Sequence, residues 1–460
     1  MGKLNLFILL IININFIYIH SFKNEKEKTL LYETEDINMI HFIKCGSSDS
    51  ILIESNGKYG LIDSSFPYKY IENEVISVNI DEKAGEENKW SEDPNYSVQA
   101  VLNYLEYLKV NKLDFIIGTH SHADHIGGIP AVAYRYVDSN TKYYYRKYRI
   151  TKEDVFDRDW ANSKYFLAAE QSMEEKGAEL IDVTDKNITF DFGDFHLELL
   201  NTEIDPEEIS LGENGNSIGT LVTIFNTKIF LAADMMAKHD RKLKDYLGKI
   251  DILKLAHHGY SDSSYEFIST TKPDYVVISN NYLPSYSYSI VNYLKENYDS
   301  KIYLTENVPG TTEIVDKSAI KLNIEKGGNK FTFSNTGEEV NIGSNVQGWY
   351  TWCNKKVYLE NGKTIKGWKE LEWAKGKDWF YFNNEGLMVI GMQKLERLGN
   401  INWYYFDEQN GNMITGWKTL NSIEGNKKFY FMPSSGIMVQ NTCITIDDKN
   451  YCFDENGYLI

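Results

Sequence analysis

Four potential metal ligands lie within six consecutive residues of this sequence: His120, His122, Asp124 and His125. The apolar residues just before them, 115–117, predict a buried strand. Because side chains alternate along extended backbone, His120 and His122 point the same way. Neutral imidazole and carboxylate suit zinc or another first-row metal. A histidine-rich surface turn is the alternative, but four such groups in an apolar environment would each need a partner. The segment therefore predicts a metal site.

The pattern His-x-His-x-Asp-His, followed by Gly127-Gly128, resembles the signature of the metallo-β-lactamase superfamily. Members of that superfamily are mostly two-metal hydrolases. The resemblance implies an α/β fold, the αββα metallo-β-lactamase sandwich, with the metals at one edge between the two sheets. It also implies that further ligands follow downstream, each at the end of a strand.

Two later segments match that expectation. The apolar run 230–233 ends in Asp234, which by the resemblance bridges two metals, and the apolar run 250–256 ends in His257-His258-Gly259. The sequence does not decide which of these two histidines completes the second metal site. We favour His257 as the ligand, with His258 either supporting the ligands from behind or facing the substrate, and we predict Asp124 and His258 as the catalytic residues. The implied sites for two Zn²⁺ or other first-row divalent ions are His120, His122 and Asp234 for one, and Asp124, His125, Asp234 and His257 or His258 for the other.

Two features leave parts of this site open. The superfamily's third-histidine ligand has no evident counterpart between Gly128 and Asp234, where Asn216-Ser217 stands instead. The coordination of the first metal is therefore undecided. Asp63 ends an apolar run and resembles an acidic residue that orients a ligand loop, although an ordinary strand-ending aspartate fits equally well.

Strands and helices must alternate along the chain to position these residues. Apolar residues at helical spacing predict an amphipathic helix over 98–108, and further helices are expected at 163–177 and 285–297. The tyrosine-rich segment 134–148 is interpreted as a loop or hairpin near the mouth of the site, contacting substrate or simply forming surface structure. The expected strands are 37–46, 49–55, 58–63, 188–192, 195–200, 218–225, 228–234, 250–256, 274–279 and 301–305, with more up to about 336.

Length, charge and cysteine content limit the possible functions. A chain of 460 residues is expected to hold two or more domains. The formal net charge of −18 argues against a nucleic-acid partner, because affinity for phosphate backbones depends on Lys and Arg. The four cysteines are too few for a disulfide framework, although Cys443 and Cys452 flank a short predicted hairpin and would face each other.

The N-terminal residues predict export. Residues 1–21 combine Lys3 with an apolar run, as in a secretory signal peptide, and a retained membrane anchor is the alternative. We expect a secreted protein associated with the cell wall or surface, without stable membrane association after signal removal. The predicted boundaries are 30–337 for the catalytic domain, 338–346 for a linker and 347–460 for a repeat domain.

The repeat domain is marked by an internal period of about 20–25 residues, typical of stacked hairpins that cannot fold alone. Gly348-Trp349, Gly367-Trp368, Gly391-Met392 and Gly416-Trp417 begin successive units, and aromatic strands and Asn-Gly turns follow. These units resemble choline-binding, cell-wall-binding repeats, which hold choline between aromatic rings through cation–π attraction. The candidate ring residues are Trp349, Trp368, Trp379, Tyr381, Trp403, Tyr405 and Trp417. The alternatives are that they only fill the repeat core, or that the repeats bind another wall glycan.

The combination of such repeats with this catalytic pattern resembles the phosphorylcholine esterases of pneumococcal type. That resemblance implies a metal-dependent phosphoric ester hydrolase acting on phosphorylcholine esters of cell-wall teichoic acid. Two other functions stay open. One is a different metallohydrolase, nuclease-like or lactone-cleaving, tethered to the wall by its repeats. The other is a non-catalytic choline-binding adhesin with a vestigial metal site.

Overall fold

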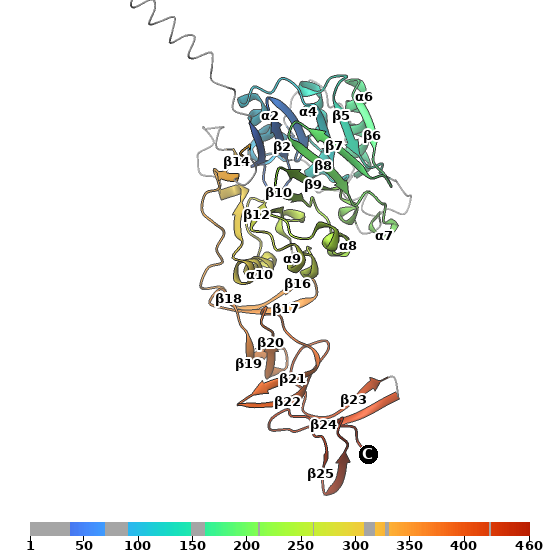
Figure 1. The fold of residues 1–460 in the computed structure, drawn as a ribbon, viewed down its shortest axis with the longest axis vertical. Helices are drawn as coiled ribbons and strands as arrows, with labels where there is room; N and C mark the ends of the chain where they lie inside the picture. Colours follow the sequence, from blue (N-terminus) through green and yellow to red (C-terminus); the bar gives the residue numbers. More distant parts are fainter. Residues whose placement is uncertain are drawn as a thin grey trace, which may run out of the picture.

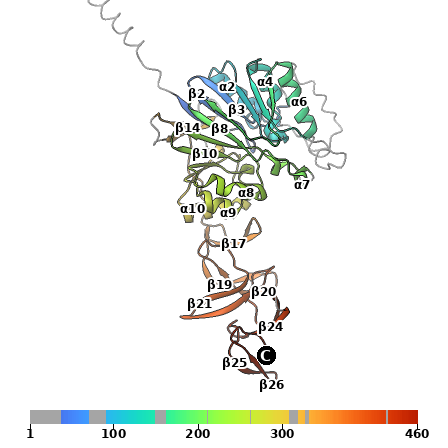
Figure 2. The same ribbon diagram turned by 45° about the vertical axis from the view of Figure 1, so that its right-hand side comes forward.

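The computed structural model describes residues 37–69, 91–148, 162–209, 212–260, 262–307, 318–326, 331–422 and 425–460. The predicted signal peptide, 1–21, lies outside these residues. Two views show an α/β sandwich, coloured blue to yellow, from which an array of hairpins, orange to red, extends (Figure 1, Figure 2). Within the described part of the chain, no helix is long and apolar enough to cross a bilayer.

Two sheets form the middle layers of the sandwich, with strand orders β15-β14-β1-β2-β3-β4-β5-β6 and β13-β12-β11-β10-β9-β8-β7. The strands of the first sheet are β1 (Asn38–Ile43), β2 (Ile51–Ser55), β3 (Lys58–Ile62), β4 (Phe115–Gly118), β5 (Lys142–Tyr145), β6 (Glu179–Asp182), β14 (Ala319–Ile324) and β15 (Phe331–Ser334). Those of the second are β7 (Ile188–Phe192), β8 (Phe195–Leu200), β9 (Gly219–Ile224), β10 (Thr227–Leu231), β11 (Ile252–Lys254), β12 (Tyr275–Ile278) and β13 (Lys301–Leu304).

Helices cover the outer faces of both sheets. The α-helices of the described residues are α2 (Val98–Tyr107), α3 (Ala123–Ile126), α4 (Ile129–Tyr136), α6 (Asn162–Glu175), α7 (Pro206–Ile209), α8 (Ala237–Leu247), α9 (Tyr265–Thr271) and α10 (Tyr288–Tyr298). Val101 of α2 and Val132 of α4 share a buried cluster with Ile116 of the first sheet. Phe267 of α9 packs in another with Leu253 of the second sheet.

A third buried cluster lies between the sheets and joins Ile53 and Ile117 to Val222 and Ile229. The predicted αββα sandwich is therefore confirmed. Strands β3, β4 and β5 run parallel to one another, as do β10, β11, β12 and β13. Parallel strands end on the same edge of a sheet, so the loops that follow them can form one site.

The sequence interpretation of the tyrosine-rich segment 134–148 is wrong in part. Residues 134–136 are the end of α4 and residues 142–145 are strand β5, in which Tyr143 and Tyr144 are buried, whereas the residues between and after these elements are loop. Tyrosine packs well in half-buried strands, which accounts for the composition. Only the last residues, 146–148, reach the mouth of the site.

The repeats form hairpins of nearly constant length. Their strands are β16 (Gly348–Trp352), β17 (Lys355–Glu360), β18 (Lys363–Thr364), β19 (Gly367–Trp373), β20 (Gly376–Phe382), β21 (Gly391–Arg397), β22 (Asn400–Phe406), β23 (Gly416–Ser422), β24 (Gly425–Phe431), β25 (Thr442–Ile446) and β26 (Lys449–Phe453). Backbone hydrogen bonds link neighbouring units, as from Met413 N to Trp379 O at 2.7 Å. In the last hairpin Cys443 and Cys452 form a disulfide, as their facing positions predict.

The first hairpin, β16–β17, packs directly on the sandwich. Trp352 is fully buried, and its Nε1 donates a hydrogen bond to Ser263 O at 2.7 Å. Residues 338–346, the expected linker, run beside the second sheet, where Val340 is buried and its N–H donates to Ile302 O at 2.9 Å. The first repeat is thus joined to the sandwich through a packed interface.

Candidate metal centre

The ligand-type side chains noted in the sequence converge at the carboxyl ends of β4, β10 and β11. Two groups form, His120, His122 and Asp234 in one and Asp124, His125, Asp234 and His258 in the other, each with ligand atoms within 4.8 Å of one another. Asp234 belongs to both groups. The local sequences explain the convergence, because each group of ligands follows an apolar strand whose end must lie at this edge.

The two carboxylate oxygens of Asp234 face different histidines. Its Oδ1 lies 3.2 Å from His125 Nε2 and 3.5 Å from His258 Nε2. Its Oδ2 faces another side, where His257 Nε2 is 3.8 Å away. A carboxylate placed in this way has an oxygen available for each of two cations.

The turns that present these side chains use left-handed backbone. The φ angles of Asp63, Ala233, His257 and His258 are 57°, 47°, 48° and 51°. For a residue with a side chain this conformation costs roughly 1–2 kcal/mol. Such strain persists only where the surrounding structure imposes it, and it concentrates at functional sites. Here it turns the side chains that follow the strands back toward the site.

The Nδ1 atoms of the histidines are held by neighbours outside the two groups. His125 Nδ1 lies 2.7 Å from Asp63 Oδ2, and His258 Nδ1 lies 3.1 Å from Ser279 O. Asp63 also accepts a hydrogen bond from the backbone N–H of Thr119 at 2.9 Å. A partner of this kind fixes the ring orientation and leaves Nε2 directed at the site. Asp63 therefore lies where a residue that orients the ligand loop would lie.

Burial and charge make the site suitable for cations. His120 Nε2 is buried and has no hydrogen-bond partner among the described residues. Burial lowers the pKa of His122 to about 4. Burial also acts to lower the pKa of His258, but the carboxylates of Asp234 and Asp124 outweigh it and raise that pKa to about 9. Buried carboxylates thus draw positive charge to this site, and imidazole and carboxylate groups together fit divalent first-row ions.

The structure places His258, rather than His257, in the four-residue group. His257 lies at the margin, with its Nδ1 paired to the Asp262 carboxylate and its Nε2 3.2 Å from Asn214 Nδ2. The preference for His257 as ligand of the second metal therefore does not match the geometry. The two residues are consecutive in the sequence, and only their backbone angles decide which ring enters the group.

Asn216-Ser217 stands roughly where the superfamily's third histidine was expected, and the side chain of Asn216 binds other protein atoms. Asn216 accepts a hydrogen bond from Asp205 N at 2.8 Å and donates one to Glu213 at 3.2 Å. Among the residues that the structure describes, His120, His122 and Asp234 are the members of the first group.

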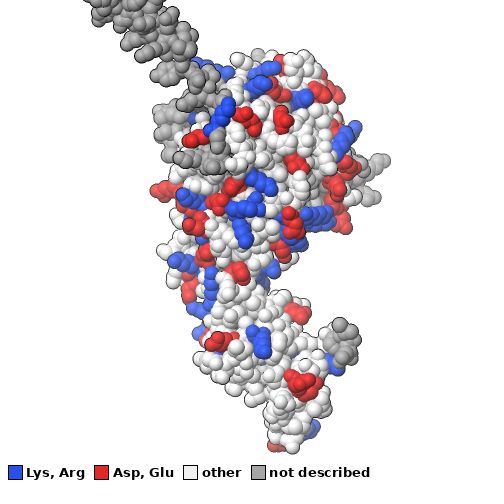
Figure 3. All heavy atoms as spheres, in the orientation of Figure 1, with Lys and Arg blue, Asp and Glu red and all other residues white. Residues whose placement is uncertain are grey.

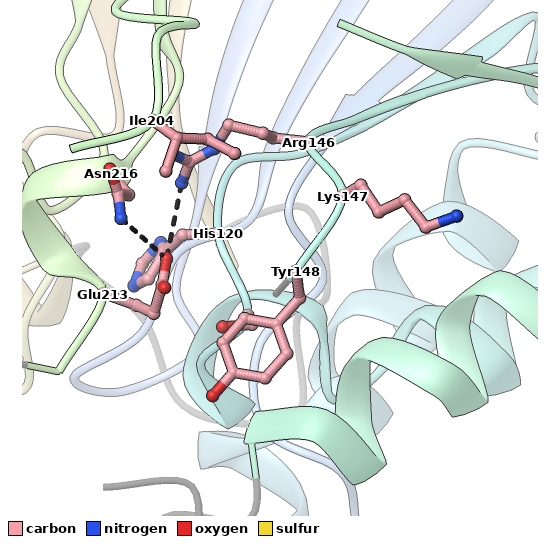
Figure 4. Close-up of a pocket in the computed structure, with 8 residues that line it drawn as sticks. His120, Arg146, Lys147, Tyr148, Ile204, Glu213 and Asn216 are labelled. Atoms are coloured by element: carbon pink, nitrogen blue, oxygen red, sulfur yellow. Dashed lines mark hydrogen bonds and ion pairs between the residues drawn. The ribbon is translucent and has the colours of Figure 1, made fainter. Parts of the chain in front are cut away.

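A small pocket beside His120 contains a residue that sequence reasoning missed. Figure 4 shows Arg146 directed toward Glu213, with Asn216 on the other side of that carboxylate. Arg146 Nη2 is 3.5 Å from Glu213 Oε2, while its Nη1 is buried without a hydrogen-bond partner in the described part of the chain. Burial lowers the pKa of this guanidinium to about 10. The enclosed space, about 10 Å³, accommodates one water-sized group.

A buried ion pair behind the site was also missed. Lys254, the last residue of β11, is fully buried and pairs with the Asp49 carboxylate, and its Nζ donates to Ala233 O at 3.1 Å. Asp49 Oδ1 lies 3.6 Å from His258 Nδ1. The only sequence signal was a lysine within the apolar run 250–256. Lys254 thus links the strand before His258 to the segment that contains Asp49 and to Ala233, the residue before Asp234.

Comparison with known families agrees with this arrangement. The profile of the Metallo-beta-lactamase superfamily matches residues 43–279, which include every residue of both groups. The chain belongs to the metallo-β-lactamase superfamily. The profile of the Choline-binding repeat matches residues 369–416, so this superfamily member also carries choline-binding repeats.

Individual relatives cover parts of the chain. "Recombination protein 2" of Haemophilus influenzae is 32% identical over 90 residues, which is 19% of this chain and 11% of that protein. The metallo-β-lactamase fold protein YhfI of Bacillus subtilis is 14% identical, covering 59% of this chain and 96% of its own, with a TM-score of 0.36. Choline binding protein F of Streptococcus pneumoniae is 26% identical, covering 32% of this chain and 47% of its own, with a TM-score of 0.21.

The candidate aromatic residues of the repeats lie between successive hairpins. Trp349 contacts Phe380, Trp368 contacts Tyr404, and Trp417 contacts Tyr451, with ring centroids 5.0, 4.7 and 4.9 Å apart. Tyr381 and Trp379 join the cluster around Tyr404, while Tyr405 is almost fully buried in the next cluster. On the face shown in Figure 3 the hairpin array is largely uncharged, whereas acidic and basic groups alternate over the sandwich.

Exchanging Asp63 for asparagine tests the role of the neighbours of the histidine rings. Asp63→Asn keeps the size of the side chain but removes the charge that holds His125 Nδ1. We expect metal affinity or hydrolytic activity to fall about 10–100-fold, the usual effect of losing such a partner. Titration of the metal-free protein with Zn²⁺ measures the change in affinity. Asp191→Asn, at the exposed Asp191–His196 pair on β7 and β8, is the control. Equal affinities in both variants contradict the expectation.

Proposed function

We propose that this protein is an exported, metal-dependent hydrolase of phosphate esters, and that its substrates are phosphorylcholine esters of cell-wall teichoic acid. The two ligand groups that share Asp234 support a two-metal hydrolase. Two divalent cations held here would supply Lewis acidity and activate water for attack at neutral pH. A side-chain nucleophile is not needed for such chemistry.

The observation that carries the choice of a phosphate ester is Arg146. Its guanidinium lines the same pocket as His120, and one of its buried nitrogens has no hydrogen-bond partner within the described residues. A buried donor left unpaired costs about 1–3 kcal/mol, so binding an anionic oxygen there is favourable. Arginine matches phosphoryl oxygens in both charge and geometry. The size of the pocket suits one such oxygen, with the rest of the ester outside.

The protein's own residues then have distinct tasks. Arg146 holds a phosphoryl oxygen beside His120. Asp124 is the most accessible carboxylate of the second group, and its Oδ2 lies 3.1 Å from His258 Nε2. Burial acts to raise the pKa of Asp124, but His125 and His258 outweigh it and lower that pKa to about 2, so this carboxylate stays ionised. It is available to orient water at the reacting phosphorus.

The repeats support the choline half of the proposed substrate. The candidate indole rings of the repeats are half-buried, and such rings attract quaternary ammonium groups, which cannot donate conventional hydrogen bonds. Attachment of the sandwich to a choline-rich polymer raises the local concentration of ester groups. Cell-wall association, following export directed by residues 1–21, is part of the proposal.

Release of phosphorylcholine from purified, choline-containing cell walls tests this function. We expect release by the zinc-loaded wild type, and a loss of about three orders of magnitude in His122→Ala, since metal Lewis acidity contributes several kcal/mol. A chelator should have the same effect as the substitution. Equal release by both proteins contradicts the esterase proposal. Release of no phosphorylcholine by a metal-loaded wild type that still binds choline favours the adhesin.

The match to Recombination protein 2 favours a second candidate, a nuclease-like hydrolase tethered to the wall. That match is 32% identical over 90 residues. Single-stranded DNA and a lactone, offered beside the wall substrate, separate the classes. Hydrolysis of DNA at a rate above that of the wall ester would select the second candidate.

A further inference from the structure

One aromatic site of the repeats already contains a cation from the chain itself. The guanidinium carbon of Arg397 lies 4.7 Å from the ring centroid of Trp368 and 4.2 Å from that of Trp379. The two tryptophans belong to hairpin β19–β20, and Arg397 is the last residue of β21. Hairpin β21–β22 follows β19–β20 along the array (Figure 1). Its Nη1 also donates a hydrogen bond to Ser435 O at 3.2 Å. The side chain is thus held between two indoles and a third unit.

The equivalent site one hairpin further on is arranged differently. Strand register pairs Glu370 with Trp379 and, at the same position of the next hairpin, Lys394 with Trp403. Beside Trp403 there is an open cavity of about 350 Å³. Its aromatic and apolar lining includes Met392, Trp403, Phe429, Met438 and Tyr458.

The sequence difference that accompanies the open cavity lies at the end of one strand. Arg397 is paired with Asn400 at the closing end of its hairpin, and Ser422 is paired with Gly425 at the closing end of the next. At the position that corresponds to Arg397, the next hairpin therefore has a serine in the sequence instead of an arginine.

Lysines near the open cavity do not fill it in the same way. Lys394 Nζ is 5.8 Å from the ring centroid of Trp403, and Lys427 Nζ is 4.9 Å from that of Tyr458. Each lysine thus contacts one ring of the cavity, whereas Arg397 contacts two indoles. The volume that remains can hold a trimethylammonium group.

We infer that Arg397 is an internal occupant that closes the Trp368–Trp379 site to choline, so that quaternary ammonium ligands bind instead in the cavity at Trp403. This inference rests on the choline binding of the proposed function and specifies which site carries it. The physical basis is competition for the same indole faces, which attract a guanidinium and a quaternary ammonium alike. A tethered group competes at an effective concentration in about the millimolar range or higher. Free choline must exceed this effective concentration to displace the Arg397 side chain.

Calorimetric titration of the full-length protein with choline chloride tests the inference. In the wild type we expect binding that Trp403→Ala abolishes. Arg397→Ser, which installs the residue found in the next unit, should gain one further equivalent of bound choline. Arg397→Gln, which keeps more of the packing but removes the charge, should gain the same equivalent. Lys449→Ser, at an exposed lysine of the last hairpin that does not line the cavity, is the control and should leave the stoichiometry unchanged.

The outcomes separate this inference from the proposed function. If Trp403→Ala abolishes choline binding but neither Arg397 variant gains a site, the inference is wrong and choline binding stands. If wild type and both Arg397 variants bind no choline, the inference and the choline half of the proposed function both fail. The double variant Arg397→Ser/Trp403→Ala supplies an internal check, because it should bind choline only at the reopened site.

Discussion

Replacing His258 with alanine is expected to abolish most hydrolysis and to remove a bound metal ion. The ring of His258 lies in the four-residue group, with Nε2 3.1 Å from Asp124 and 3.5 Å from Asp234. Its removal leaves Asp124, His125 and Asp234 as the remaining ligands of the group. Because metal Lewis acidity contributes several kcal/mol, we expect a loss of about three orders of magnitude in kcat/KM. Metal content by elemental analysis and hydrolysis of a soluble phosphorylcholine ester measure the two effects.

The neighbouring histidine gives the decisive comparison. His257 is paired through Nδ1 with Asp262 and lies outside the four-residue group, so His257→Ala should retain both metal ions and lose about 10–100-fold in activity. His196→Ala, at an exposed histidine of β8, should leave activity unchanged. Loss of metal from His257→Ala but not from His258→Ala would restore the assignment first made from the sequence.

This pair of residues also illustrates what the sequence could and could not predict. The sandwich and the ligand segments could be predicted because each group of ligands follows an apolar run that forms a buried strand. The choice between His257 and His258 could not be predicted. It depends on two consecutive residues with left-handed backbone, with φ of 48° and 51°, and their residue types do not predict that conformation.

Long-range pairs were equally hidden. Asp49 and Lys254 are 205 residues apart, and neither lies in a recognisable pattern with the other. Arg146 was noted only as part of a tyrosine-rich segment, because its contact with Glu213 forms across two sheets. A basic residue within or just after a predicted buried strand is the one sequence signal that could have identified both Lys254 and Arg146.

The second large effect is expected at Trp352, far from the metal ligands in the sequence. It is among the largest fully buried side chains, and its ring centroid is 5.0 Å from that of Tyr293 and 5.8 Å from that of Tyr265. From sequence it was indistinguishable from the aromatic residues of the other repeats. In the structure it fastens the first hairpin to the loop that contains Ser263.

Trp352→Ala should therefore destabilise the sandwich by about 3–5 kcal/mol, the usual cost of deleting a large buried ring. It should also lower activity, because Ser263 follows Asp262, the partner of His257 Nδ1. The thermal midpoint of the sandwich and hydrolysis of a soluble ester, which does not require wall binding, measure both effects. Trp352→Phe keeps a ring but loses the hydrogen bond, and should cost much less in activity.

Trp417→Ala serves as the matched control in a distant repeat. Trp417 packs on Tyr430 and Tyr451 within the hairpin array. Its loss should weaken that array without moving the midpoint of the sandwich or the rate on a soluble ester. If Trp352→Ala behaves like Trp417→Ala, the first hairpin is only a tether. If it alone impairs hydrolysis, the first repeat is a structural part of the catalytic unit, and truncation before residue 348 should reproduce the defect.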